Sequence, residues 1–143
     1  MAKQSVVLAI DIGTSSVRAL VCDADGSALD GLEAQITYRL ATTHDGGAEF
    51  PADDLCAIMI EAIEQTVSKA DPTDYEFIAV GITSFWHSLL GLDETGSPVT
   101  PIYFWVDSRS DATIAELGDM VDRAALRQRT GCRLHSSYWP AKL

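Results

Sequence analysis

The segment D-I-G-T-S-S-V-R at residues 11–18 has the residue types of a phosphate-binding turn. A glycine beside small hydroxylated residues lets backbone N–H groups approach a phosphate closely, and an aspartate at a strand end can hold Mg²⁺ through water. An ordinary hairpin turn, whose hydroxyl groups only satisfy the local backbone, has the same composition, so the local sequence leaves both interpretations open. If the turn binds a phosphate-bearing cofactor, the residues that would bind it are Asp11, Gly13, Thr14, Ser15, Ser16 and Arg18. Asp11 would also be the metal ligand.

A second group of residues could bind a polyhydroxy compound. Trp86 and His87 follow an apolar run that is expected to be a buried strand, and Asp107 and Arg109 follow a second turn. An aromatic ring can cover the C–H surface of a sugar while polar side chains form directional bonds to its hydroxyl groups. Taken alone, the same residues could be a core tryptophan, a satisfied histidine and a surface Asp–Arg pair.

The elements that would position the first group are strands joined by tight turns. Strands are expected at residues 5–12, 17–22 and 29–40, and Asp25-Gly26 is a strong hairpin signal between the last two. Two successive hairpins predict an antiparallel start to a sheet. Residues 42–49 contain Gly46-Gly47 and are expected to be a loop.

Helical periodicity begins after this loop. Residues 53–69 have apolar side chains at helical spacing, and a strand at 77–83 then makes a β-α-β crossover and a mixed sheet. Extended segments at 88–92 and 100–105 follow, and then helices at 110–118 and 122–130, the second ending at Gly131. The chain is therefore expected to form one α/β unit.

Composition excludes several classes of protein. The net charge of −11, with only 10 Lys and Arg in 143 residues, argues against a nucleic-acid surface. The three cysteines contain no CxxC pair, which argues against a zinc site or a disulfide framework. The apolar run at residues 6–10 is too short for a signal peptide or a membrane span, so no membrane association is expected and the expected compartment is the cytoplasm.

Three motifs in order resemble a known family. The segment 11–18 resembles the first phosphate motif of the actin and sugar-kinase superfamily. The pattern G-I-x-x-x-x-H from Gly81, followed by W-x-D-x-R-S from Trp105 and by T-G with a later Lys142, resembles FGGY carbohydrate kinases. The resemblance implies an actin-like ATPase (ribonuclease H-like) α/β fold, with an antiparallel arrangement of the first three strands in a mixed sheet. It also implies ATP and Mg²⁺ as cofactors and a small sugar or sugar acid as substrate.

The resemblance also suggests which sugar is bound. Glycerol kinases have an Arg-Glu pair at the place of Trp86-His87, which disfavours glycerol. His87-Ser88, Arg109-Ser110 and His135 follow the gluconate kinase pattern, with xylulose kinase as the second choice. Arg109 would bind the gluconate carboxylate and His87 a hydroxyl group; the alternative is that Arg109 is a structural partner of Asp107.

The resemblance places part of the enzyme outside residues 1–143. The general-base aspartate, the second phosphate motif and the ATP-binding second lobe are expected beyond Leu143, so no catalytic residue is assigned within the chain. We therefore expect the N-terminal portion of domain I, truncated at its C-terminal side, inactive alone and able to form a homodimer through exposed apolar surface. The alternatives are a non-catalytic sugar- or nucleotide-binding module and a phosphatase or ATPase of the same superfamily.

Overall fold

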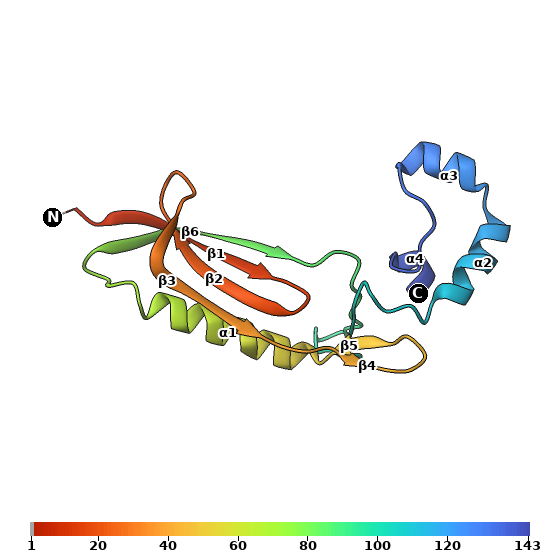
Figure 1. Ribbon diagram of the computed structural model, residues 1–143, viewed down its shortest axis with the longest axis horizontal. Helices are drawn as coiled ribbons and strands as arrows, with labels where there is room; N and C mark the ends of the chain where they lie inside the picture. Colours follow the sequence, from red (N-terminus) through yellow and green to blue (C-terminus); the bar gives the residue numbers. More distant parts are fainter. Residues whose placement is uncertain (1) are drawn as a thin grey trace. The chain divides into compact units, whose positions relative to one another are not determined.

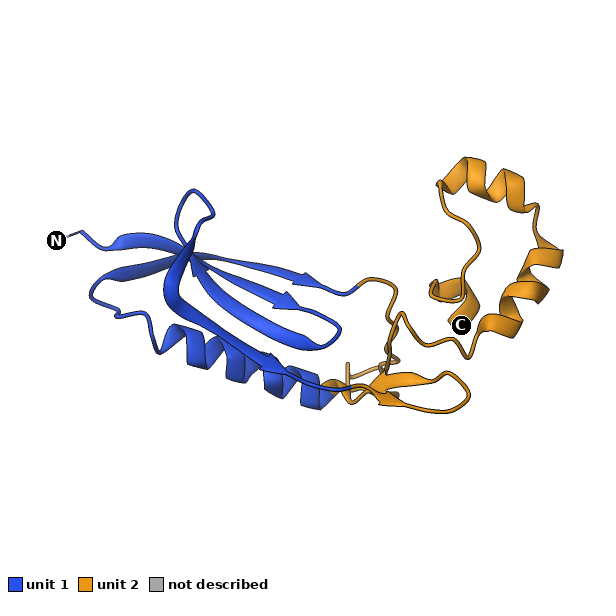
Figure 2. Cartoon of the chain, in the orientation of Figure 1, with its two compact units in different colours: residues 1–39, 53–85 blue, residues 40–52, 86–143 orange. Residues whose placement is uncertain are grey.

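The computed structural model describes residues 2–143, which form two compact units (Figure 2). Unit 1 consists of residues 1–39 and 53–85, and unit 2 consists of residues 40–52 and 86–143. The sequence predicts one globular unit, and the difference arises because the chain leaves the first unit at residue 40, returns at 53 and leaves again at 86.

Unit 1 is built on a four-stranded sheet in the order β3-β2-β1-β6 (Figure 1). Its strands are β1 (Gln4–Ile12), β2 (Ser16–Cys22), β3 (Ala28–Thr37) and β6 (Tyr75–Ser84). The first three strands are antiparallel, and β6 is parallel to β1. This confirms the predicted mixed sheet. The turn between β2 and β3 has Gly26 at φ 82°, as the Asp-Gly signal requires.

Helix α1 (Ala52–Val67) packs across one face of this sheet (Figure 1). Strand residues alternate between the two faces, so Val17, Ala19 and Val21 of β2 are all buried. The helix contributes Thr66, which is fully buried and whose Oγ1 donates to the backbone oxygen of Ala19 at 3.0 Å. The predicted helix is confirmed, and it ends two residues earlier than expected.

Strand β6 is exposed, which contradicts the expectation of a buried strand leading to Trp86. Its apolar residues Ile78, Val80 and Ile82 have exposed fractions of 61, 64 and 63%. Strands in parallel arrangement are usually apolar because both of their faces are covered. Here the helix lies over β1 to β3, so the apolar composition of β6 is not matched by burial within the described residues.

Unit 2 contains a small sheet in the order β4-β5-β7. Its strands are β4 (Ala41–Thr42), β5 (Ala48–Phe50) and β7 (Ile102–Tyr103). The expected loop at 42–49 is therefore wrong in part, because its two ends pair as a hairpin whose strands are too short to show periodicity. The expected extended segments at 88–92 and 100–105 reduce to β7 and to isolated bridges at Leu89 and Leu92.

Three helices complete unit 2: α2 (Asp111–Met120), α3 (Arg123–Thr130) and α4 (Trp139–Lys142). Asp122 caps α3 by accepting from the amides of Ala124 and Ala125, and Gly131 ends it at φ 75°. The two predicted helices are confirmed, and α4 is too short to have been predicted. Across residues 2–143, no helix has the length and apolar character needed to cross a membrane.

Candidate functional site

The candidate phosphate turn joins β1 to β2 in unit 1. The Gly13 amide closes the turn by donating to the Ser16 oxygen at 2.9 Å. Tyr38, which directly follows β3, fixes the turn, because its amide donates to the Ser15 oxygen at 3.0 Å and its hydroxyl donates to the Gly13 oxygen. Burial raises the pKa of Tyr38 to about 12, so this hydroxyl stays protonated and remains a donor. Sequence reasoning missed Tyr38, since only the strand pairing brings it to the turn.

Asp11 and Arg18 are directly opposite each other on the sheet face away from α1. Arg18 also forms an ion pair with Glu33, and this hydrogen bond raises the pKa of Arg18. The Asp11 carboxylate is exposed at the end of β1, where an oxygen ligand suits Mg²⁺. Residues 2–143 contain no group of three or more potential metal-binding side chains, so a Mg²⁺ ion at Asp11 would need its remaining ligands from phosphate and water.

His87 lies at a cavity of about 400 Å³ in unit 2. Its ring is between Trp86 at 5.8 Å and Tyr138 at 4.5 Å, measured between ring centroids. Its backbone has φ 60°, a left-handed conformation that is uncommon for residues other than glycine and is often found at functional sites. His135 and Tyr138 line the same cavity, whereas Trp86 is 77% exposed and does not.

Ser88 follows His87 and has the one buried side-chain oxygen without a hydrogen-bond partner in the described part of the chain. Its backbone oxygen is satisfied, because Trp139 Nε1 donates to it at 3.1 Å. Buried hydroxyl groups are normally paired, so Ser88 Oγ is an exception, although Ser88 lines neither of the cavities described here.

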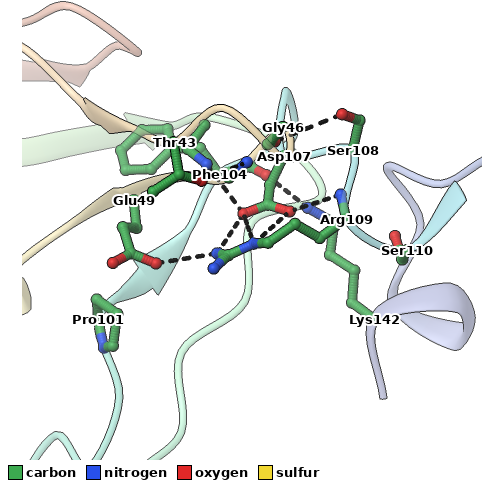
Figure 3. A network of polar contacts seen from close by, with 12 residues as sticks. Thr43, Gly46, Glu49, Pro101, Phe104, Asp107, Ser108, Arg109, Ser110 and Lys142 are labelled. Carbon is green, nitrogen blue, oxygen red and sulfur yellow. Dashed lines mark hydrogen bonds and ion pairs between the residues drawn. The ribbon is translucent and has the colours of Figure 1, made fainter.

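Asp107 is the buried centre of a polar network in the same unit (Figure 3). It accepts from the Ala48 amide at 3.0 Å and from the Arg109 amide at 3.1 Å, and it pairs with the Arg109 guanidinium at 2.5 Å. Burial raises the pKa of Asp107, but the bonds from Arg109 and Ala48 outweigh it and leave this pKa below 3.8. Asp107 is therefore ionised, and both of its carboxylate oxygens accept hydrogen bonds.

Arg109 binds two carboxylates rather than one. Besides Asp107, it contacts Glu49 at 2.9 Å, and its guanidinium lies 5.3 Å from the ring centroid of Tyr103. These bonds raise the pKa of Arg109, with Asp107 as the larger cause. Glu49 was missed by sequence reasoning because it belongs to the segment that was expected to be a loop.

The Gly46-Gly47 turn allows this network to close. Gly46 has φ 93°, and a Cβ atom there would lie 2.2 Å from Ser108 Oγ. A Cβ atom on Gly47 would lie 3.0 Å from the guanidinium carbon of Arg109. The two glycines thus let the β4–β5 turn approach the 107–109 segment closely.

The predicted substrate residues lie in different places within unit 2. Asp107 and Arg109 line a second cavity of about 360 Å³, together with Lys142, and Ala141 of α4 borders both cavities. Desolvation lowers the pKa of Lys142, whose ammonium donates to the Phe104 oxygen at 2.5 Å. His87 thus belongs to one cavity, Asp107 and Arg109 belong to the other, and Trp86 lines neither. Their roles in substrate binding stay predictions.

Known proteins similar to this chain include glycerol kinases and gluconokinases. A glycerol kinase of Alcanivorax borkumensis is 31% identical over 138 residues, which cover 96% of this chain and 27% of that protein. A gluconokinase of Bacillus subtilis is 27% identical over 131 residues, covering 92% of this chain and 25% of that protein. The chain thus spans about a quarter of the length of the curated relatives that it matches.

A solved structure confirms the expected actin-like fold. The xylulose kinase from Rhodospirillum rubrum matches 96% of this chain and 28% of its own, with a TM-score of 0.88 and 24% identity. Residues 6–143 match the N-terminal domain of the FGGY family of carbohydrate kinases. Because this match covers nearly the whole sequence, the chain belongs to the FGGY family of carbohydrate kinases.

Proposed function

We propose that the protein containing this chain transfers a phosphoryl group from ATP, with Mg²⁺, to a hydroxyl group of a small sugar or sugar acid. The observation that carries the proposal is the family match over residues 6–143. The turn at Gly13–Ser16 would contact phosphate through its backbone, and Asp11 would hold Mg²⁺ through water. In such reactions the protein acts mainly by positioning the reactants and stabilising charge.

We propose gluconate as the preferred substrate and xylulose as the second. In support, His87 and His135, which follow the gluconate kinase pattern, line one cavity with Tyr138. Imidazole nitrogens can donate to or accept from hydroxyl groups. Glycerol kinases are also among the relatives, at 31% identity, so the choice rests on these side chains and not on overall similarity.

The contacts of Arg109 favour its alternative role as a structural partner of Asp107. Its charge is already balanced by Asp107 and Glu49, and the same side chain lies against Gly47. We therefore propose that Arg109 positions the 107–109 segment against the β4–β5 turn. Replacing it with alanine in the longer protein would then lower stability and the activities on gluconate and xylulose together, with their ratio unchanged.

The test of the proposed function uses the longer protein that contains this sequence. ADP release is measured with ATP, Mg²⁺ and gluconate, xylulose, ribulose or glycerol in turn. His87→Asn keeps a residue that tolerates φ 60° but removes the imidazole, and we expect kcat/KM for the preferred substrate to fall about 10-fold or more. His44→Asn, at an exposed turn position, is the matched control.

Three results would each overturn part of this proposal. Absence of sugar-dependent ADP release with every compound of the panel would remove the kinase function. Equal activity of the His87→Asn protein and the control would remove His87 from the substrate site. A glycerol rate far above the gluconate rate would reverse the order of substrates proposed here.

The isolated chain should not phosphorylate a sugar. No carboxylate lines the His87 cavity, and Asp107, which lines the second, is a poor base because its pKa is lowered and its oxygens accept bonds from Arg109 and Ala48. Sugar-dependent ADP release by the purified 143-residue chain, above that of a mock purification, would contradict this expectation.

We further propose that the chain associates with a second copy through β6 and that the protein is cytoplasmic. The exposed apolar residues of β6 support the first point. The free cysteines Cys22, Cys56 and Cys132 suit a reducing compartment and support the second. Light scattering on the chain, and fractionation of cells that produce the longer protein, test the two points separately.

A further inference from the structure

A hollow lined in part by arginines lies beside α3, and it shares Arg133 and Leu134 with the His87 cavity. It has a volume of about 710 Å³. Arg123 and Arg127 reach it from one side of the helix, and Arg133 reaches it from the segment that follows. Residues 123 and 127 are neighbours on the helix surface because they are four positions apart. Three arginines from two segments therefore line one space.

These three arginines differ from the arginines of the chain that form ion pairs. Arg18 and Arg109 form ion pairs with carboxylates, whereas within residues 2–143 no ion pair involves Arg123, Arg127 or Arg133. The chain as a whole carries a net charge of −11, so acidic side chains are plentiful. An unpaired cationic cluster in an acidic protein is a local site for an anion, since the protein as a whole repels anions.

Arg123 is held in position by a glycine of the preceding helix. Its Nε donates to the Gly118 oxygen at 3.4 Å, which leaves the terminal nitrogens of the guanidinium for other partners. A Cβ atom at residue 118 would lie 1.6 Å from a terminal nitrogen of Arg123.

We propose that Arg123, Arg127 and Arg133 form a binding site for a small multivalent anion that carries phosphate groups. A guanidinium presents two parallel N–H groups to two oxygens of one phosphate, which an ammonium cannot do. Three such groups around a hollow of this volume suit a pyrophosphate or a phosphorylated metabolite better than a single monovalent anion. Arg133 also lines the His87 cavity, whereas none of the three arginines lines the Asp107 cavity or belongs to the β1–β2 turn.

The test is a calorimetric titration of the 143-residue chain with inorganic pyrophosphate at low ionic strength. Arg127→Gln and Arg133→Gln are compared with Arg129→Gln, which removes the same charge from the same helix but does not line the hollow. We expect the dissociation constant to rise about fivefold or more in the first two variants and less than about twofold in the control. Gly118→Ala should weaken binding as well, because it displaces Arg123 without changing the charge.

Circular dichroism of each variant checks that the fold is kept. In any variant that is less stable, changes in amide chemical shifts on adding pyrophosphate show which residues lie near the bound anion. The proposal is overturned if pyrophosphate gives no binding at low ionic strength. It is equally overturned if Arg129→Gln weakens binding as much as Arg127→Gln, since the effect would then reflect total charge. Equal affinity for chloride and for pyrophosphate would exclude a phosphate-selective site.

Discussion

Unit 1 and unit 2 are held together by different interactions. The buried residues of unit 1 are almost all apolar and come mainly from β1, β2 and α1, with Thr66 as the buried polar exception. Unit 2 buries few apolar side chains, chiefly Phe104 and Ile102, and it buries three polar ones: Asp107, Ser110 and Ser137. The first unit is thus stabilised mainly by burial of apolar area, and the second depends on a charged network.

The difference has a practical use because all three tryptophans are in unit 2. Trp86, Trp105 and Trp139 make tryptophan fluorescence a reporter of that unit, whereas unit 1 is followed by amide exchange in its strands. Perturbations of the two units can therefore be read separately. The predictions below use this separation, beginning with the largest expected effect.

Leu8→Ala should have the largest effect. Leu8 is 6% exposed in the core of unit 1, and its truncation leaves a cavity that costs about 3–4 kcal/mol of unfolding free energy. We expect faster amide exchange in β1 to β3 and a small change in tryptophan fluorescence. Leu92→Ala, at a site that is 56% exposed in unit 2, is the matched control. Equal loss of stability in both variants would contradict the prediction.

Asp107→Asn should destabilise unit 2 by about 2–3 kcal/mol. The substitution keeps the size of the side chain but removes the charge that pairs with Arg109 and weakens the acceptor for the Ala48 amide. Denaturant unfolding followed by tryptophan fluorescence should shift to lower denaturant, with amide exchange in β1 to β3 unaffected. A shift below about 0.5 kcal/mol would show that the network contributes little.

Gly46→Ala and Gly26→Ala compare two glycines that have similar backbone angles in different units. Both have positive φ, at 93° and 82°, so alanine is strained at each. Only Gly46 has a neighbour that a Cβ atom would strike, namely Ser108 Oγ. We expect a loss of about 2 kcal/mol at Gly46 and about 1 kcal/mol at Gly26. Thermal unfolding of Gly46→Ala,Ser108→Gly should recover part of the difference, and no recovery would exclude the steric explanation.

Acid should weaken unit 2 through Asp107. Because the pKa of Asp107 is lowered in the folded protein, its contribution is fully present above the ordinary value of 3.8 and is lost as pH falls through the folded value. The wild-type chain should therefore lose more unit 2 stability below about pH 4 than Asp107→Asn does. The same acid slope in both proteins would show that other carboxylates, such as Asp93, are responsible.

Local signals account for what could be predicted. The Asp25-Gly26 turn, the alternation of β1 and β2 and the helical spacing of α1 are short-range features, so the sheet and its helix follow from the sequence. The network around Asp107 could not be predicted, because it joins Ala48 to a residue 59 positions away and no local pattern encodes that contact. The phosphate-binding role of the β1–β2 turn stays a prediction from its residue types, and the support of this turn by Tyr38 depends on strand register.

The two edges of the unit 1 sheet differ in a way that limits how copies of the chain can assemble. The β3 edge carries Asp30 and Glu33, and Lys69 already binds the Glu33 backbone oxygen, so a further strand is disfavoured there. The β6 edge is ten residues long and has one charged residue, Glu76. If two copies join β6 to β6 around a two-fold axis, only their β3 edges stay unpaired. These are the edges at which a further strand is disfavoured. Growth would stop at two chains, and fibrils would not form by this route.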